Sequence, residues 1–188
     1  NGDTKTVLKI VGDCNKRDTG TSIYFLPNPK YFDVPRFDVK HLKATLRAKA
    51  VLCPQLTVTF EDENSGESIS WHFEKGIADY LKEKTALFAH IPEQPFIGSF
   101  SGETEAVDWG VTWLSESGEI TAESYANLIP TPQGGTHVSG FRAGLSDAMR
   151  EFCEIHKLLP RGIKLTPEDI WQNCAYILSA KLKDPQFS

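Results

Sequence analysis

Residues 127–154 read NLIPTPQGGTHVSGFRAGLSDAMREFCE, and the pattern of this stretch is the starting point for predicting the fold. Two prolines and two consecutive glycines precede a run in which apolar residues recur every three or four positions. That spacing predicts an amphipathic helix, the longest in the chain. Its apolar positions are Val138, Phe141, Leu145, Met149, Phe152 and Ile155. The glycines predict a tight turn into the helix.

The flanking segments alternate strands with shorter helices. Residues 96–100, 105–114 and 120–129 predict three strands in a meander, with residues 115–119 (SESGE) as the turn between the second and the third. Pro92 and Pro95 predict a loop before them. After the long helix, Thr166 and Pro167 have the pattern of a helix start, and residues 175–182 predict a closing strand.

The first half of the chain has a similar pattern. Residues 7–12 and 21–26 predict a strand pair, and residues 76–85 predict a short helix. Apolar residues at helical spacing from Val39 to Ala50 predict another helix, with Asp38 as its N-cap and Pro54 as its end. Residues 56–60 and 69–73 alternate around Asn64-Ser65-Gly66, which predicts a hairpin. Strands with a few covering helices indicate an α+β fold with helices on one face of the sheet.

Length and composition set the broad class of the protein. The chain has 188 residues, of which 40% are hydrophobic and 24% charged, as expected for a globular domain. A net charge of −5 argues against a protein that coats nucleic acid with its whole surface. The four cysteines form no CxxC pair, which excludes a zinc or thioredoxin-like motif. No apolar run reaches 18 residues and no signal peptide is evident. The chain does not start with methionine, and we expect a fragment of a longer protein.

A local basic stripe stands out against this acidic background. No acidic residue occurs between Asp38 and Glu61, whereas this stretch contains Lys40, Lys43, Arg47 and Lys49. At 100° per residue the first three fall within about 60° of one another on a helix, opposite its apolar positions. Two interpretations remain open: a solvated helix face or a stripe that contacts phosphates.

The segment Gln133-Gly134-Gly135-Thr136-His137 also allows several interpretations. Glycines before a helix can form a phosphate loop, and His137 could act as a metal ligand or general base. However, the chain contains neither GxxxxGK[ST] nor HExxH. A structural turn formed by Gly134, Gly135 and His137 is therefore favoured. The four cysteines and four tryptophans are expected to be core or partly buried packing residues.

Five segments resemble the B subunits of bacterial type IIA DNA topoisomerases. They are residues 18–28 (DTGTSIYFLPN), 46–54 (LRAKAVLCP), 105–109 (EAVDW), 127–154 and 184–188 (DPQFS). The sequences of these segments are more similar to topoisomerase IV than to its near relative gyrase. The resemblance covers essentially the whole chain.

The resemblance implies a domain organisation. Residues 1–28 would be the terminal strand pair of an incomplete GHKL ATPase domain. Residues 29–188 would be a transducer domain that ends just before an expected Gln-Thr-Lys loop. The family transducer has a fold similar to domain 2 of ribosomal protein S5, with a mixed sheet and a left-handed βαβ crossover, an exception to the usual handedness. It couples ATP binding and hydrolysis to movement of the DNA gate.

The resemblance also implies ligands, partners and site residues. ATP and Mg²⁺ would bind to the full-length protein, with Thr21 and Ile23 as part of the adenine pocket wall. The other nucleotide-binding elements of the family match no segment of this chain, so no catalytic or metal-binding residue is expected and the fragment alone should be inactive. Candidate DNA contacts are Lys40, Lys43, Arg47, Lys49 and Arg142. The partners would be DNA, the A subunit of topoisomerase IV and a second B subunit. The protein would act at the chromosome in the bacterial cytoplasm, and no membrane would be a partner.

Two alternatives to a topoisomerase IV fragment stay open at this point. One is the transducer of a gyrase B subunit. The other, from a different functional class, is a self-contained small enzyme, ligand-binding domain or interaction domain that uses the GGTH turn. A self-contained enzyme needs a complete catalytic constellation within 188 residues, and none is found in this sequence. The coupling module is therefore favoured.

Overall fold

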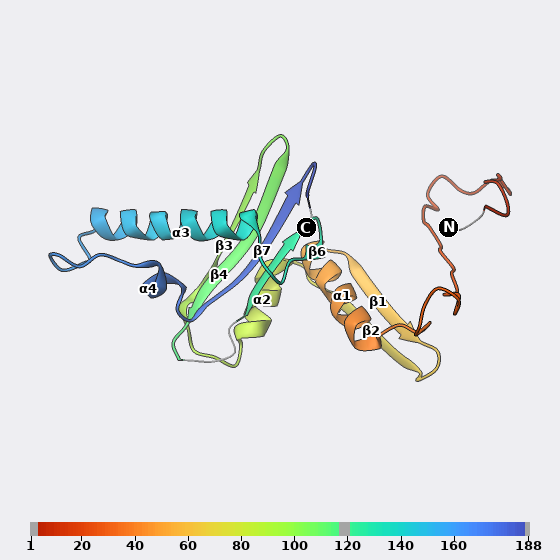
Figure 1. Ribbon diagram of the computed structural model, residues 1–188, viewed down its shortest axis with the longest axis horizontal. Helices are drawn as coiled ribbons and strands as arrows, with labels where there is room; N and C mark the ends of the chain where they lie inside the picture. The colour runs from red at the N-terminus through yellow and green to blue at the C-terminus, as the bar shows by residue number, and fades with distance from the viewer. Residues whose placement is uncertain (1–3, 117–120, 187–188) are drawn as a thin grey trace. The chain divides into compact units, whose positions relative to one another are not determined.

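The computed structural model describes residues 4–116 and 121–186, and its contacts divide the chain into the units Asn1–Asp38 and Val39–Ser188 (Figure 1). The described part of the first unit contains no helix or strand. The strands predicted at residues 7–12 and 21–26 are therefore wrong for this chain, and apolar side chains there, such as Val7 and Leu26, are exposed. An isolated pair of strands is marginally stable at best, and the described residues of this unit provide no third strand to support one.

The second unit begins with a helix and a hairpin, as predicted. Helix α1 (Val39–Leu52) ends two residues before Pro54, and its last three residues are buried. Strands β1 (Thr57–Asp62) and β2 (Glu67–His72) pair antiparallel. Gly66 has φ +72° at the turn between them, in the left-handed region that glycine adopts without strain. Helix α2 (Ile77–Thr85) follows and buries Ile77, Tyr80 and Leu81, as predicted.

A five-stranded mixed sheet forms the rest of the unit. Its strands are β3 (His90–Ser101), β4 (Glu105–Leu114), β5 (Ala122–Ala126), β6 (Ile129–Pro130) and β7 (Cys174–Leu182), in the spatial order β3-β4-β7-β5-β6. Strand β7 is antiparallel to β4 and parallel to β5. The α+β class with a mixed sheet is confirmed.

The predicted three-strand meander is wrong, because β7 lies between β4 and β5. The centre of β7 is almost completely buried, and a buried strand needs a hydrogen-bonded neighbour on each side. The predicted loop at Pro92 and Pro95 is also wrong: both prolines lie in β3, an edge strand that tolerates them, with a register shift between Ile91 and Phe96. Most of the predicted SESGE turn, and the first residue of the strand predicted at 120–129, lie outside the described residues.

The helices pack on both faces of this sheet, whereas the sequence predicted one face. A Cβ on Gly110 of β4 would meet Ile77 and Leu81 of α2 at 3.1 Å. The ring of the preceding residue, Trp109, instead lies 5.7 Å from Phe141 of helix α3. Because successive residues of a strand point to opposite faces, α2 and α3 lie on opposite sides.

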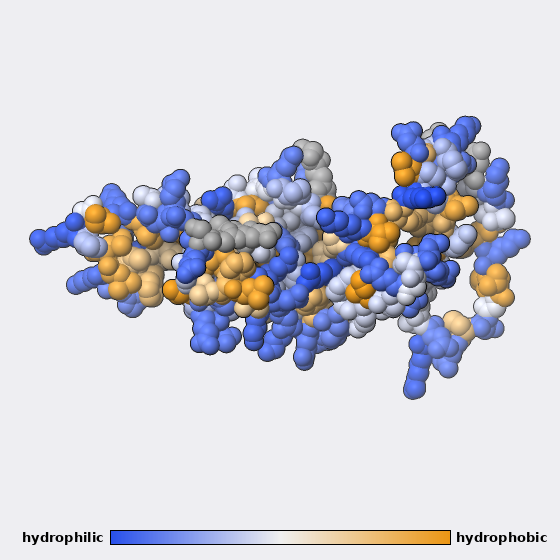
Figure 2. Space-filling model, turned by 90° about the horizontal axis from the view of Figure 1, so that it is seen from below, coloured by the Kyte–Doolittle hydropathy of each residue, from blue (hydrophilic) through white to orange (hydrophobic). Residues whose placement is uncertain are grey.

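Helix α3 (Thr136–Ile155) is confirmed in position, but the C-terminal end of its predicted apolar face is exposed. Val138 is buried, whereas Phe152 and Ile155 are 56% and 67% exposed. The C-terminal half of α3 extends past the edge of the sheet (Figure 1). Apolar surface also appears toward this end of the molecule (Figure 2), where Leu158 and Ile163 follow the helix and are exposed.

Helix α4 (Pro167–Trp171) leads from this region into β7. Its predicted start is confirmed as a capping box, in which the Asp169 backbone N–H donates to Thr166 Oγ1 and the Thr166 N–H donates to Asp169 Oδ2. Helices α3 and α4 thus connect the parallel strands β5 and β7 through a crossover. No helix in the described ranges is long and apolar enough to cross a membrane.

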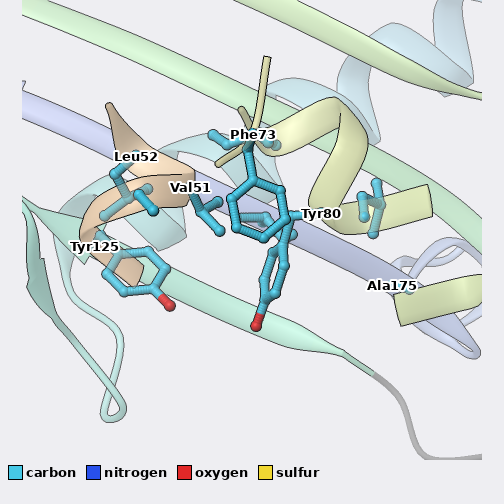
Figure 3. Packing of buried hydrophobic residues seen from close by; sticks show 10 residues of the cluster. Val51, Leu52, Phe73, Tyr80, Tyr125 and Ala175 are labelled. Atoms are coloured by element: carbon cyan, nitrogen blue, oxygen red, sulfur yellow. The ribbon is translucent and has the colours of Figure 1, made fainter. Parts of the chain in front are cut away.

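The hydrophobic core joins α1, α2 and the five-stranded sheet. Figure 3 shows Val51 and Leu52 of α1 packed with Phe73, Tyr80 of α2 and Tyr125 of β5. All four tryptophans are partly buried, as predicted. Of the cysteines, Cys174 is buried and Cys53 and Cys153 are half-buried, but Cys14 is exposed, contrary to the prediction. One buried cluster therefore joins α1 and α2 to the sheet.

Candidate functional site

The basic stripe of α1 is accompanied by acidic partners that lie far away in the sequence. Lys43 forms an ion pair with Glu67 of β2, and its ammonium lies 5.3 Å from the ring centroid of Phe60. Arg47 forms an ion pair with Glu83 of α2, and its guanidinium lies 5.1 Å from the ring centroid of Tyr80. Both cations are therefore held between a carboxylate and an aromatic face.

The two ends of the stripe differ from its centre. The Lys49 ammonium donates a hydrogen bond to the backbone carbonyl of Leu128, next to β5. Lys40 is exposed and makes no ion pair or hydrogen bond with the part of the chain that the structure describes. The structure thus brings the four cations together on one helix, but it leaves only Lys40 without a protein partner among the described residues.

Beneath Arg47 lies a polar network that the sequence did not predict. The hydroxyl of Tyr80 donates to Glu123 Oε1 at 3.0 Å, and that of Tyr125 donates to Glu123 Oε2 at 2.7 Å. Lys84 lies 4.0 Å from the same carboxylate. The sequence identified Tyr80 as inward-facing, but its acceptor lies 43 residues away on a different element, and only the fold brings the two together.

This network is a structural connection between α2 and β5. Burial raises the pKa of both tyrosines well above their ordinary value, and the neighbouring Glu123 carboxylate raises it further. Both phenols therefore remain protonated donors at neutral pH. A carboxylate that accepts two such bonds fixes the helix to the strand but leaves no group suited to proton transfer.

Arg142 is separated from the α1 stripe. It lies on the exposed side of α3, where its guanidinium is 4.8 Å from the ring centroid of Trp171. Pro167, Glu168 and Gln172 of the α4 region line the shallow depression next to it. Helix α1 shares its buried core with α2, which lies on the opposite face of the sheet from α3. The candidate DNA contacts therefore form two separate basic positions rather than one patch.

The GGTH segment has the geometry of a structural turn. Gly134 and Gly135 have φ values of +78° and +149°, where only glycine is free of strain. The Gly134 N–H donates to the Thr131 carbonyl at 2.9 Å. His137 Nε2 lies 3.1 Å from the Thr131 hydroxyl, and burial lowers the pKa of the imidazole. His137 is thus held against the turn, and no metal-binding group of side chains surrounds it in the described residues, which favours packing over catalysis.

The nucleotide-pocket candidates lie in the first unit. Thr21 and Ile23 are both exposed, and Ile23 retains 80% of its accessible surface. Among the described residues, no group of three or more His, Cys, Asp or Glu side chains could hold a metal ion. These residues do not by themselves form a pocket for a nucleotide and its metal ion.

Comparison with known proteins identifies the family. The sequence model of the DNA gyrase B family matches residues 76–188, which is more than half of the chain. The chain belongs to the DNA gyrase B family. The B subunit of DNA topoisomerase 4 from Pseudomonas aeruginosa is 56% identical over 181 residues, which cover 96% of this chain and 29% of that protein. This member of the DNA gyrase B family thus spans less than a third of the length of that relative.

Solved structures agree with this assignment. The topoisomerase IV ATP-binding domain of Francisella tularensis, solved with a small-molecule inhibitor, superposes with a TM-score of 0.71 at 40% sequence identity. The match covers 86% of this chain and 43% of the Francisella chain. The 43K ATPase domain of Thermus thermophilus gyrase B, solved with an aminocoumarin, gives a TM-score of 0.73 at 28% identity. The match covers 86% of this chain and 44% of the gyrase chain. The family resemblance noted in the sequence is therefore confirmed in sequence and in fold.

Proposed function

We propose that this chain is part of the B subunit of a bacterial topoisomerase IV, an ATP-dependent enzyme that passes one DNA duplex through a double-strand break in another. In this role it couples ATP binding and hydrolysis to movement of the DNA gate. The observation that carries the proposal is the 56% identity to the B subunit of a topoisomerase 4 over 96% of the chain. Among the solved structures, the identity of 40% to the topoisomerase IV ATP-binding domain exceeds the 28% to the gyrase B ATPase domain, which favours topoisomerase IV over gyrase.

The proposed domain organisation assigns residues 1–28 to the end of the ATPase domain and residues 29–188 to the transducer. The exposed apolar side chains of the first unit support this, because they would be covered if its segments paired with strands of a complete ATPase domain. The continuous core of the second unit supports a mechanical role. It connects α1, α2 and the sheet through one cluster of buried side chains.

ATP and Mg²⁺ would be ligands of the complete subunit rather than of this chain. Thr21 and Ile23 would contribute a part of the adenine pocket wall, with the hydroxyl as a hydrogen-bonding group and the apolar side chain against the base. Their exposure fits a contribution that is completed elsewhere in the subunit. No chemical step is assigned to residues of this chain.

DNA, the A subunit of topoisomerase IV and a second B subunit would be the partners of the complete subunit in the bacterial cytoplasm. Lys40, Lys43, Arg47 and Lys49 on α1, together with Arg142 on α3, would contact the passing duplex through its phosphates. Such contacts are electrostatic and independent of base sequence. The arrangement in two separate positions suits a surface that guides a duplex rather than one that retains it.

Reconstitution of the complete B subunit with its A subunit tests the proposal. We expect ATP-dependent relaxation of supercoiled plasmid and separation of linked DNA rings, without introduction of negative supercoils into relaxed plasmid. Introduction of negative supercoils would instead assign the chain to gyrase. The lack of any ATP-dependent change in DNA topology would contradict both assignments and favour a self-contained domain.

A further inference from the structure

The two central cations of the α1 stripe are already bound by carboxylates of the same chain. We propose that Glu67 and Glu83 act as internal competitors of DNA phosphate for Lys43 and Arg47, so that a duplex can contact α1 without being retained there. This inference rests on the proposed contact between α1 and DNA, and it concerns how strongly that contact binds.

The geometry of the pairs permits such an exchange. The side chains of Glu67 and Glu83 are 41% and 56% exposed, and those of Lys43 and Arg47 are 25% and 30% exposed. Ion pairs in contact with water are weak and open readily. A phosphate carries the same kind of charged oxygen acceptor as a carboxylate and can therefore replace it.

The aromatic neighbours keep the cations in place when the carboxylates leave. Lys43 lies over Phe60 and Arg47 over Tyr80, whose hydroxyl is in turn fixed by Glu123. Neither ring depends on Glu67 or Glu83 for its position. The cations are thus preorganised, and the carboxylates determine whether they are available.

The charge balance defines the expected effect. The stripe carries four cations, and the two carboxylates neutralise half of this charge. Removing the carboxylate charges would free two cations for phosphate contacts. Each phosphate contact adds about 0.9 to the slope of log Kobs against log salt concentration, so two contacts add about 1.8. Raising the salt fourfold would then weaken binding roughly 12-fold more than in the wild type.

The test measures binding of the complete B subunit to a fluorescently labelled DNA duplex at several salt concentrations. The variant Glu67→Gln/Glu83→Gln is compared with the control Glu61→Gln/Glu63→Gln. The control changes net charge by the same amount and lies on the hairpin that carries Glu67, but its two glutamates form no ion pair in the described part of the chain. We expect tighter binding and a steeper salt slope for the first variant only. The two single variants should each give about half of the increase in slope.

Equal binding and equal slopes for the two double variants would overturn the inference, because the gain would then reflect net charge alone. The variant Lys40→Ala/Lys43→Ala/Arg47→Ala separates this outcome from failure of the DNA contact itself. If this triple variant binds DNA as the wild type does, the proposed contact of α1 with DNA is wrong. If it binds more weakly while Glu67→Gln/Glu83→Gln matches its control, only the competition is wrong.

Discussion

Replacing Gly98 by alanine should destabilise the sheet, because this glycine makes room for a tryptophan. Gly98 of β3 pairs with Trp109 of β4, and a Cβ at position 98 would lie 2.2 Å from Trp109 Cζ2 and 2.3 Å from Cε2. No real contact is this short, so the indole must move. It packs against Phe141 of α3 at a centroid distance of 5.7 Å, and the displacement is therefore passed on to the helix.

The magnitude follows from two opposing terms. Overpacking a well-filled site costs about 1–3 kcal/mol, whereas alanine gains roughly 0.5–1 kcal/mol over glycine inside a strand. The central values of the two ranges give a net loss in the free energy of unfolding of about 1 kcal/mol, measured by urea denaturation. Gly144→Ala in α3 is the control: a Cβ there meets nothing within 4 Å, so helix propensity should stabilise the protein by about 0.5–1 kcal/mol. A Gly98→Ala protein as stable as the wild type would refute the reasoning.

Three further predictions concern the core, the α4 cap and the ligands. Leu81→Ala, at a completely buried position, should lower the free energy of unfolding by about 2–5 kcal/mol, whereas Leu87→Ala, at 93% exposure, should leave it unchanged. Hydrogen bonds from Thr166 lower the pKa of the Asp169 carboxyl. The ionised carboxylate therefore stabilises the fold fully above the ordinary pKa of an aspartate, and this stabilisation is lost as the pH falls through the lowered pKa. The free energy of unfolding of Asp169→Asn should accordingly fall less in acid than that of the wild type, and parallel pH profiles would contradict this. Calorimetric titration of the 188-residue chain with a non-hydrolysable ATP analogue should show no saturable heat, and micromolar binding would contradict the partial pocket.

The sequence correctly predicted the helices and strands whose boundaries are set by residues close together in the chain. The boundaries of α1, the β1–β2 hairpin and the α4 capping box depend on residues within a few positions of one another, such as Pro54, Gly66 and Thr166. Strand order depends instead on which segments bury β7, and periodicity contains no such information. The apolar row of α3 has the spacing of a core face, but Phe152 and Ile155 lie beyond the edge of the sheet that would cover them.

The candidate site shows the same division between local and distant information. The basic residues of α1 are visible as a stripe because helical geometry relates positions three and four apart. Their partners Glu67 and Glu83 follow 24 and 36 residues later, and the acceptor of Tyr80 follows 43 residues later. Such pairs require the tertiary fold. The predicted roles of Thr21, Ile23 and Arg142 remain predictions that depend on the complete subunit.

The proposed coupling role is tested by measuring strand passage and ATP hydrolysis side by side in the reconstituted enzyme that carries Lys40→Ala/Lys43→Ala/Arg47→Ala. Because the altered side chains belong to α1 and not to the proposed nucleotide pocket, ATP hydrolysis without DNA should stay at the wild-type rate while plasmid relaxation slows. The control Lys75→Ala/Lys82→Ala, which removes one exposed lysine just before α2 and one within it, should change neither rate. Wild-type relaxation by a correctly folded triple variant would contradict the role of α1 and leave the stripe as a solvated helix face.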